Sequence, residues 1–163
     1  MPSSPSGLMS VDKPARILVL ADRSALDPAL IDAIRARARQ GLAQFRVVVP
    51  NPAPAEWHPM HPERRDKAAE AEQALERALP TLEEAAGSSV IASVSIRHDP
   101  MDVVDSVISH EPVDEIILSQ SAHPVQRWFH VDLPHRLAHL DLPITAVDAK
   151  SATDAEGRQP LEP

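Results

Sequence analysis

Polar residues able to contact a ligand follow three aliphatic runs in the sequence. These residues are Asp22, Arg23, Ser24, Asn51, Ser119 and Ser121. Asp22 could hydrogen-bond a hydroxyl or an amine of a ligand, or it could simply cap the turn after the first run. If the runs are parallel strands, these side chains gather at one edge of a sheet, where such folds bind ligands. The pattern therefore predicts a ligand crevice rather than a catalytic centre.

A second group of candidates follows the third of those runs. Arg127 lies beside Trp128, with His123 and His130 nearby. Arginine offers a planar set of donors and histidine can carry positive charge at mildly acidic pH, so Arg127 and His130 could bind an anion. The simpler interpretation, which we prefer, is that Trp128 and Phe129 anchor this segment on the core while Arg127 is solvated.

Arrangements typical of hydrolases and metal sites are absent from the sequence. There is no cysteine and no Gly-x-Ser-x-Gly motif, so thiolate chemistry and a serine-hydrolase elbow are excluded. His135 and His139 are four residues apart and would share a helix face, but two ligands are too few for a metal. We therefore expect no catalytic residues, no metal and a protein that binds rather than catalyses.

The elements that must position the crevice residues alternate along the chain. Continuous apolar runs indicate strands buried on both faces, and the stretches between them have helical periodicity. Asp27-Pro28 and Asp99-Pro100 each have the form of an N-cap followed by a first helical proline. This alternation predicts an α/β fold, a doubly wound five-stranded parallel sheet with helices on both faces. We expect the strand order 3-2-1-4-5, which periodicity alone does not give.

Two segments are less regular. A helical stripe spans Glu63–Ala86, but Pro80 lies inside it and should either kink the helix or end it. From Val90 to Ile96 every second residue is apolar, which predicts a half-exposed strand at the sheet edge.

Composition limits the possible partners. The net charge is −8, and aromatic residues make up only 2% of the chain, which argues against binding nucleic acid. No stretch is apolar for the length of a membrane span, and the N-terminus is unlike a signal peptide, so we expect a cytoplasmic protein. The predicted organisation is a disordered tail over 1–14, one domain over 15–149 and a second disordered tail over 150–163.

Four stretches of the sequence resemble the universal stress protein family. They are the strand ending at Asp22, the helix opened by Asp99-Pro100, the strand Asp114–Ser119 and the closing segment Leu142–Val147. The resemblance covers Arg16 to about Asp148. It implies the fold predicted above, and Asp22 matches the family's acidic residue at the end of the first strand, which helps to position a nucleoside.

The resemblance also implies where ATP would bind. ATP-binding members carry a Gly-x2-Gly-x9-Gly-Ser/Thr stretch after the fourth strand, whose glycines let the backbone approach the phosphates. In this sequence Ser119 and Ala122 stand at the first two glycine positions, and Val131 and Asp132 lie near the third. Asp132 could also cap the last helix and add negative charge where an anion would bind. We therefore expect no ATP bound in the family manner and no other cofactor.

Three hypotheses remain open from the sequence. The first is a universal-stress-protein-like binding or regulatory domain without ATP. The second is a nucleotide-binding stress protein, for ATP or AMP, whose phosphate loop is rebuilt around Arg127 and His130 while Asp22 and Ser121 hold the nucleoside. The third is a structural subunit. Family members commonly pair through the last strand, so we expect a homodimer through Ile144–Val147, an edge that offers a template for pairing.

Overall fold

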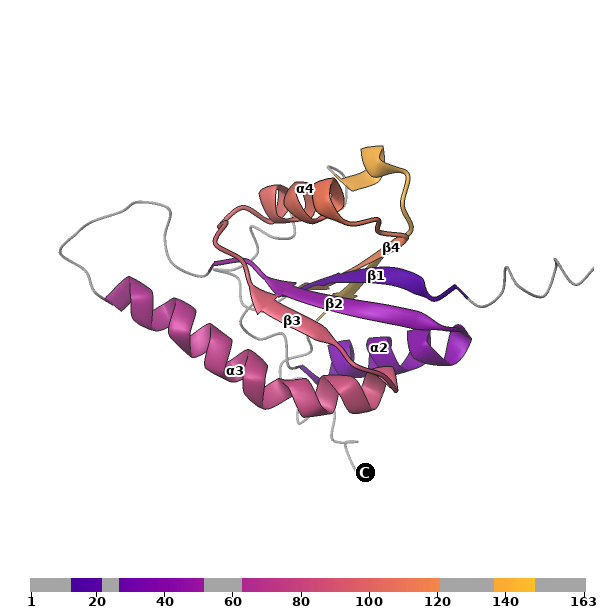
Figure 1. The fold of residues 1–163 in the computed structure, drawn as a ribbon, viewed down its shortest axis with the longest axis horizontal. Helices are drawn as coiled ribbons and strands as arrows, with labels where there is room; N and C mark the ends of the chain where they lie inside the picture. The colour runs from indigo at the N-terminus through magenta and orange to yellow at the C-terminus, as the bar shows by residue number, and fades with distance from the viewer. Residues whose placement is uncertain (1–12, 22–26, 52–62, 121–136, 149–163) are drawn as a thin grey trace, which may run out of the picture.

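The fold is built on one parallel sheet. The computed structural model describes residues 13–21, 27–51, 63–120 and 137–148. Its strands lie in the order β3-β2-β1-β4-β5, and every neighbouring pair is parallel (Figure 1). The predicted doubly wound sheet and its strand order are confirmed. The strands are β1 (Ala15–Leu20), β2 (Ala43–Val49), β3 (Ile91–Val94), β4 (Glu115–Gln120) and β5 (Ile144–Asp148).

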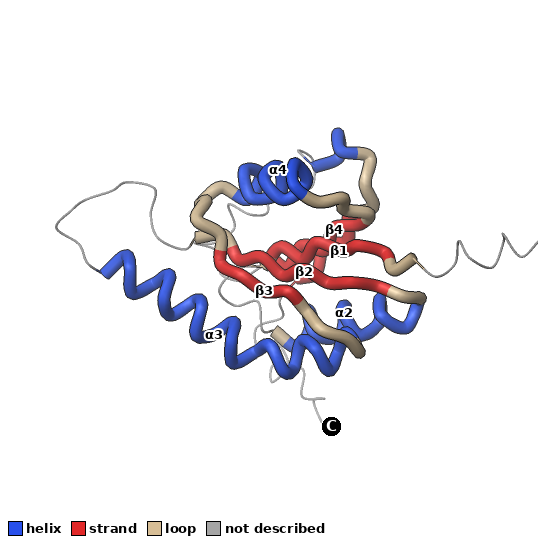
Figure 2. The backbone as a smooth tube through the Cα atoms, in the orientation of Figure 1, coloured by secondary structure: helices blue, strands red, loops and turns tan. Residues whose placement is uncertain are grey.

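Helices cover both faces of the sheet. The helices α2 (Pro28–Gln40) and α3 (Glu63–Ala86) lie against one face, and α4 (Pro100–His110) lies against the other (Figure 2). A short 3-10 helix, η3 (Ala138–Leu140), follows the buried Leu137 on the α4 side. Right-handed crossovers account for this arrangement, because the chain moves toward one sheet edge through α2 and α3 and returns across the other face through α4.

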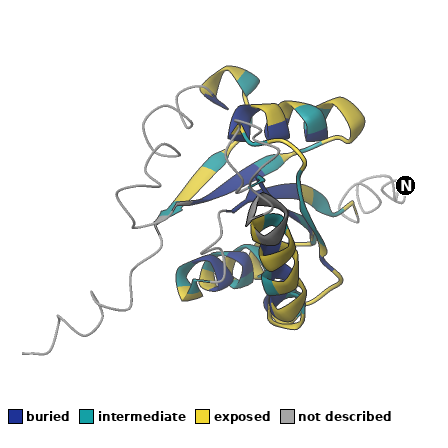
Figure 3. Ribbon diagram, turned by 90° about the vertical axis from the view of Figure 1, so that its left-hand side faces the viewer, coloured by how far each residue is buried: buried dark blue, intermediate teal, exposed yellow. Residues whose placement is uncertain are grey.

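Two apolar layers hold the helices to the sheet. Alternate residues of a strand point to opposite faces, so Ile17 and Val19 pack with α2 and α3, whereas Leu18 and Leu20 pack with α4. All four side chains are almost completely buried. The buried residues line the strands and the inner sides of the helices (Figure 3). An unbroken aliphatic run is therefore what β1 requires, because both of its faces lie in the core.

The predicted helix ends are confirmed. Asp27 accepts a hydrogen bond from the Ala29 amide at 2.7 Å, and Asp99 accepts one from the Met101 amide at 2.8 Å. The α4 helix ends at Glu111, whose backbone is extended, as expected of a residue before proline. Gly87 follows α3 with φ +68°, a left-handed conformation that favours glycine at a helix end.

Pro80 does not end α3. The helix continues through it over Glu63–Ala86, and its axis changes direction part-way along (Figure 1). Proline cannot donate to the carbonyl four residues earlier, at a cost of about 3 kcal/mol. Beyond Pro80, however, Leu82, Ala85 and Ala86 are all buried in the core. Burying Leu82 alone contributes roughly 1.5–3 kcal/mol, so packing of this last segment offsets the penalty.

The edge strand β3 is shorter than its alternating pattern predicted. It ends at Val94, and Ile96, expected to continue the inward-facing series, is 87% exposed. The edge position is confirmed, because β3 pairs with β2 alone within the described sheet. A two-residue period shows which residues could face inward, but not where the supporting helix stops covering them.

Candidate functional site

The strand order reverses between β1 and β4, and Ser119 lies at that point. Leu20 is in register with Leu118, so Ala21 and Ser119 are neighbours at the carboxyl ends of the two strands. Both face the α2 layer, as Ile117 does. Ser119 is only 1% exposed, and its hydroxyl has no hydrogen-bond partner among the described residues. The predicted site residue is therefore at the expected edge, but its side chain is packed into the core.

Asn51 joins the same edge from the end of β2. Its backbone amide donates to the Arg97 carbonyl at 2.8 Å, and its carbonyl lies 3.2 Å from Nδ1 of His98. Because the acceptor is a carbonyl, Nδ1 of His98 must carry the proton. These bonds tie the end of β2 to the segment between β3 and α4, so Asn51 is held in place through its backbone.

Arg97 and His98 are site candidates that the sequence prediction missed. Arg97 is exposed and His98 is half-buried, and both follow β3 at the carboxyl edge. When its ring is neutral, His98 has Nε2 left as an acceptor for a ligand hydroxyl or amine. The available signal was the same as for the other strands: a polar run, Arg97-His98-Asp99, directly after an apolar one.

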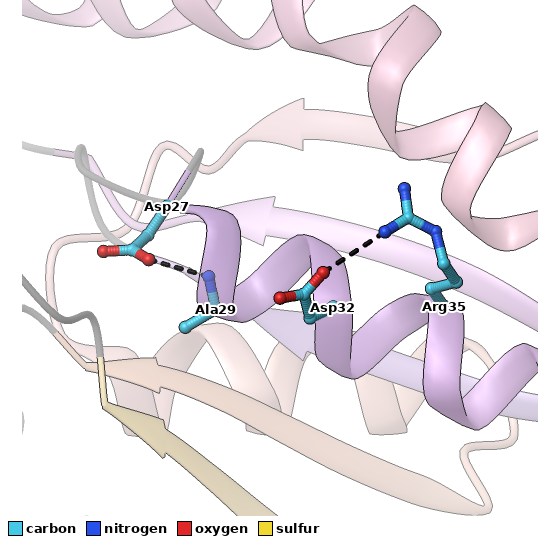
Figure 4. Close-up of polar contacts among 4 residues, drawn as sticks. All are labelled: Asp27, Ala29, Asp32 and Arg35. Atoms are coloured by element: carbon cyan, nitrogen blue, oxygen red, sulfur yellow. Dashed lines mark hydrogen bonds and ion pairs between the residues drawn. The ribbon is translucent and has the colours of Figure 1, made fainter. Parts of the chain in front are cut away.

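Two of the helix N-termini, those of α2 and α4, are already capped. The carboxylate of Asp27 accepts a hydrogen bond from the Ala29 amide (Figure 4). The backbone carbonyl of Asp27 accepts from the amides of Leu30 and Ile31 at 3.0 and 3.3 Å. Asp99 caps α4 in the same way. A helix N-terminus attracts anions through its free amides and its dipole. Here a fixed carboxylate occupies each of these two ends, so neither of them is a vacant phosphate site.

Six of the predicted site residues lie outside the described residues, and the structure does not test them. They are Asp22, Arg23, Ser24, Ser121, Arg127 and His130. The structure thus brings Asn51, Ser119, Arg97 and His98 to one edge of the sheet. The proposed contribution of the other six to that edge remains a prediction.

A separate cavity lies at the opposite, amino end of the strands. Its volume is about 350 Å³, and it lies between the sheet and the C-terminal end of α4. An ion pair between Arg46 and Glu111 lines it, and Nε of Arg46 has no hydrogen-bond partner among the described residues. Parallel sheets bind ligands beyond the carboxyl ends of their strands. We therefore place the candidate site at the carboxyl edge and not in this cavity.

Two kinds of site find no support in the described part of the chain. No three His, Asp or Glu side chains there lie close enough to hold a metal ion. None of the described helices is long and apolar enough to cross a membrane.

Comparison with known proteins identifies the architecture. No protein-family model matches the chain, and no curated protein sequence matches it. Among solved structures, the universal stress protein UspA from Lactobacillus plantarum is similar with a TM-score of 0.61 at 14% identity, over 83% of this chain and 98% of that one. The fold is that of the universal stress proteins. The resemblance seen in the sequence is thereby confirmed.

Two other universal stress proteins were solved with nucleotides. One, from Archaeoglobus fulgidus and in complex with dAMP, has a TM-score of 0.55 and 16% identity, over 82% of this chain and 97% of that one. Another, in complex with cAMP, has a TM-score of 0.52 and 13% identity, over 84% of this chain and 98% of that one. At such low identity the universal-stress-protein fold is shared, and the function of this chain must be argued from its own residues.

Proposed function

We propose that this chain is a binding or regulatory module with the universal-stress-protein fold that does not bind ATP in the manner of ATP-binding family members. The observation that carries the proposal is the loss of glycine at the phosphate loop. Ser119, Ala122 and Asp132 stand at or near the three glycine positions, and glycine there is what lets backbone amides approach phosphates.

The surroundings of Ser119 support this proposal. Ser119 is buried. Its neighbour on one side is Ala21, the residue directly after β1, and on the other side it is Val147 of β5. The two capped helix ends support it as well, since Asp27 and Asp99 supply negative charge of the kind that Asp132 would add. Side chains at the glycine positions would keep a triphosphate away from the backbone amides, and the carboxylates would repel its negative charge.

Titration calorimetry with ATP and Mg²⁺ tests the proposal. We expect no saturable heat at millimolar ATP with the native chain. A triple variant, Ser119→Gly with Ala122→Gly and Asp132→Gly, is expected to gain measurable affinity. Micromolar binding of ATP by the native chain would refute the proposal, and mass spectrometry of small molecules released from freshly purified protein provides an independent check.

A second candidate is a nucleotide-binding stress protein with a rebuilt phosphate loop. The favouring observation is that the two neighbours described above were solved with dAMP and cAMP, which carry one phosphate rather than three. In this alternative Arg127 and His130 hold the phosphate, and Asp22 and Ser121 hold the nucleoside. Binding of AMP that persists unchanged in Asp22→Ala would count against it.

We also propose that the chain forms a homodimer through β5. In the described sheet β5 pairs with β4 alone, and no described strand pairs with the backbone on its other side. Thr145 and Ala146 are exposed on this strand. A cytoplasmic location, expected from the sequence, stays a prediction.

A further inference from the structure

At the β3 edge of the sheet, hydrogen bonds show which way the backbone amides and carbonyls point. Ser95 donates its amide to the Val49 carbonyl at 2.8 Å, and the Arg97 carbonyl accepts from Asn51 at 2.8 Å. In a parallel strand, the amide and carbonyl of one residue point to the same side, and successive residues alternate. The backbone amides and carbonyls of Ser93 and Ser95 therefore point toward β2. Those of Ala92 and Val94 point away from the sheet.

A groove runs beside that outward edge. It has a volume of about 280 Å³ and lies between β3 and α3. The apolar walls are formed by Leu75 and Leu79 of α3 and by Ala92 and Val94 of β3. The polar part of the lining is Ser93, Glu72 and Glu76. Both glutamates are exposed. The groove thus combines apolar walls with a negatively charged border.

The face of β3 turned toward α4 offers one apolar side chain, Ile91, followed on the same face by Ser93. Ile91 is 62% exposed there, on the side opposite the groove. An additional strand at this edge would place alternate side chains on the two faces. Long side chains on the α3 face could lie along Leu75 and Leu79, and aliphatic ones on the other face could pack against Ile91.

We propose that the β3 edge binds an extended segment of another protein in which lysine or arginine alternates with aliphatic residues. The segment adds a strand to the sheet through the outward groups of Ala92 and Val94, a mode in which backbone hydrogen bonds give affinity and alternate pockets give specificity. The aliphatic parts of the basic side chains lie along the apolar walls of the groove, and their charged ends reach Glu72 and Glu76.

Charge selects this occupant over a second copy of the chain. The side chains described on α3 include five glutamates, against Lys67 and Arg77 as the basic ones. Two copies meeting at β3 would bring two acidic helices together, which is unfavourable. The proposal concerns a different edge from the nucleotide site, so it holds whether or not the carboxyl edge binds a nucleotide.

Fluorescence anisotropy with a short labelled peptide of alternating lysine and valine tests the proposal. We expect saturable binding that weakens as salt is raised, since exposed charges contribute. Val94→Pro removes one outward amide without touching the ladder to β2, and proline is tolerated on edge strands. This variant should weaken binding by about fivefold or more, the worth of one backbone hydrogen bond.

Matched controls separate this mode from general attraction to an acidic protein. A peptide of the same composition with its lysines and valines in separate blocks should bind more weakly than the alternating one. Ser93→Pro removes an inward amide and should instead lower the melting temperature. The double variant Glu72→Lys with Glu76→Lys leaves the strand intact and should abolish the salt-dependent part of binding. This variant tests the proposal even if Val94→Pro does not fold.

Three results would overturn the proposal. One is equal binding of the alternating and block peptides. Another is unchanged affinity in both the folded Val94→Pro protein and the double glutamate variant. The third is a dimer, detected by light scattering, that Val94→Pro dissociates, because this would assign the β3 edge to a second copy.

Discussion

Ser119 shows how one buried atom bears on the function of the carboxyl edge. Its hydroxyl has no hydrogen-bond partner in the described chain, and a buried polar group left in that state costs about 1–3 kcal/mol. A residue that packs at such a cost, at a position that aligns with a glycine of ATP-binding universal stress proteins, is positioned to receive a ligand's polar atom or to exclude phosphate. Measuring the stability of variants distinguishes a satisfied hydroxyl from an unsatisfied one.

We predict that Ser119→Ala leaves the protein as stable or raises its stability by up to about 1 kcal/mol, because no hydrogen bond is lost. Ser95→Ala is the matched control. The hydroxyl of Ser95 accepts from the Arg97 amide at 3.0 Å, so this variant should lose about 1 kcal/mol. Urea denaturation measures both. A clear loss of stability in Ser119→Ala would mean that the hydroxyl is hydrogen-bonded.

At this scale the sequence predicted the helix caps well, and its assignment of ligand-binding residues stays a prediction. Asp27 and Asp99 were identifiable because capping is local: an aspartate before a proline has few other roles. Asn51 and Ser119 lie at the carboxyl ends of strands as expected, because strand ends are visible in the pattern. Arg97 and His98 were missed because their place in the site depends on the backbone bonds to Asn51, a contact between distant parts of the chain.

Among the elements, α3 departs furthest from what local rules can decide. A proline in a helix interior is compatible with a kink or with an end, and the sequence left both open. Burial of Leu82, Ala85 and Ala86 beyond Pro80 depends on the sheet beneath them. Tertiary packing therefore decided an outcome that helix propensity alone could not.

We predict that Pro80→Ala stabilises the protein by about 1–3 kcal/mol, because an amide donor is restored and Pro80 is exposed, so no core contact is lost. Thermal unfolding measures the change. Thr81→Ala, also at an exposed position of α3, is the control, and it should gain only the several tenths of a kcal/mol by which alanine exceeds threonine in helix propensity. A fall in the melting temperature of Pro80→Ala would show that the change in direction of α3 is itself needed to seat its last residues on the sheet.

Some features of the arrangement of the elements could be predicted from the sequence, and others could not. Continuous apolar runs identified the strands, because a strand buried on both faces needs them. The order of the strands was expected from the doubly wound class of fold, since the hydrophobic period contains no information about which strands are neighbours. The early end of β3 was not predictable, because exposure of Ile96 depends on how far the flanking helix reaches.

At the scale of the whole molecule, the described sheet ends in two edge strands, β3 and β5, each paired on one side. The amide of Ile116 donates to the Pro143 carbonyl at 2.9 Å, so Pro143 and Thr145 face β4 and Ala146 faces away. The strand order puts this outward backbone at the opposite edge from β3. Each edge can therefore be tested by itself.

We predict that light scattering finds a dimer for the native chain and a monomer for Ala146→Pro, because proline removes an outward amide at the proposed interface. Thr145→Pro is the paired control, and it should reduce stability by breaking the bonds to β4. Monomeric behaviour of the native chain at high concentration would remove the dimer from the proposal.

The opposite placement of β3 and β5 has a consequence for avidity. If two copies pair symmetrically through β5, their sheets join into one, and a β3 edge lies at each end of it. Neighbouring strands are spaced by roughly 4.8 Å, so the two β3 edges would be about 45 Å apart. Such a dimer is bivalent, and a partner with two suitable segments on a linker of matching length would be held far more tightly than either segment alone.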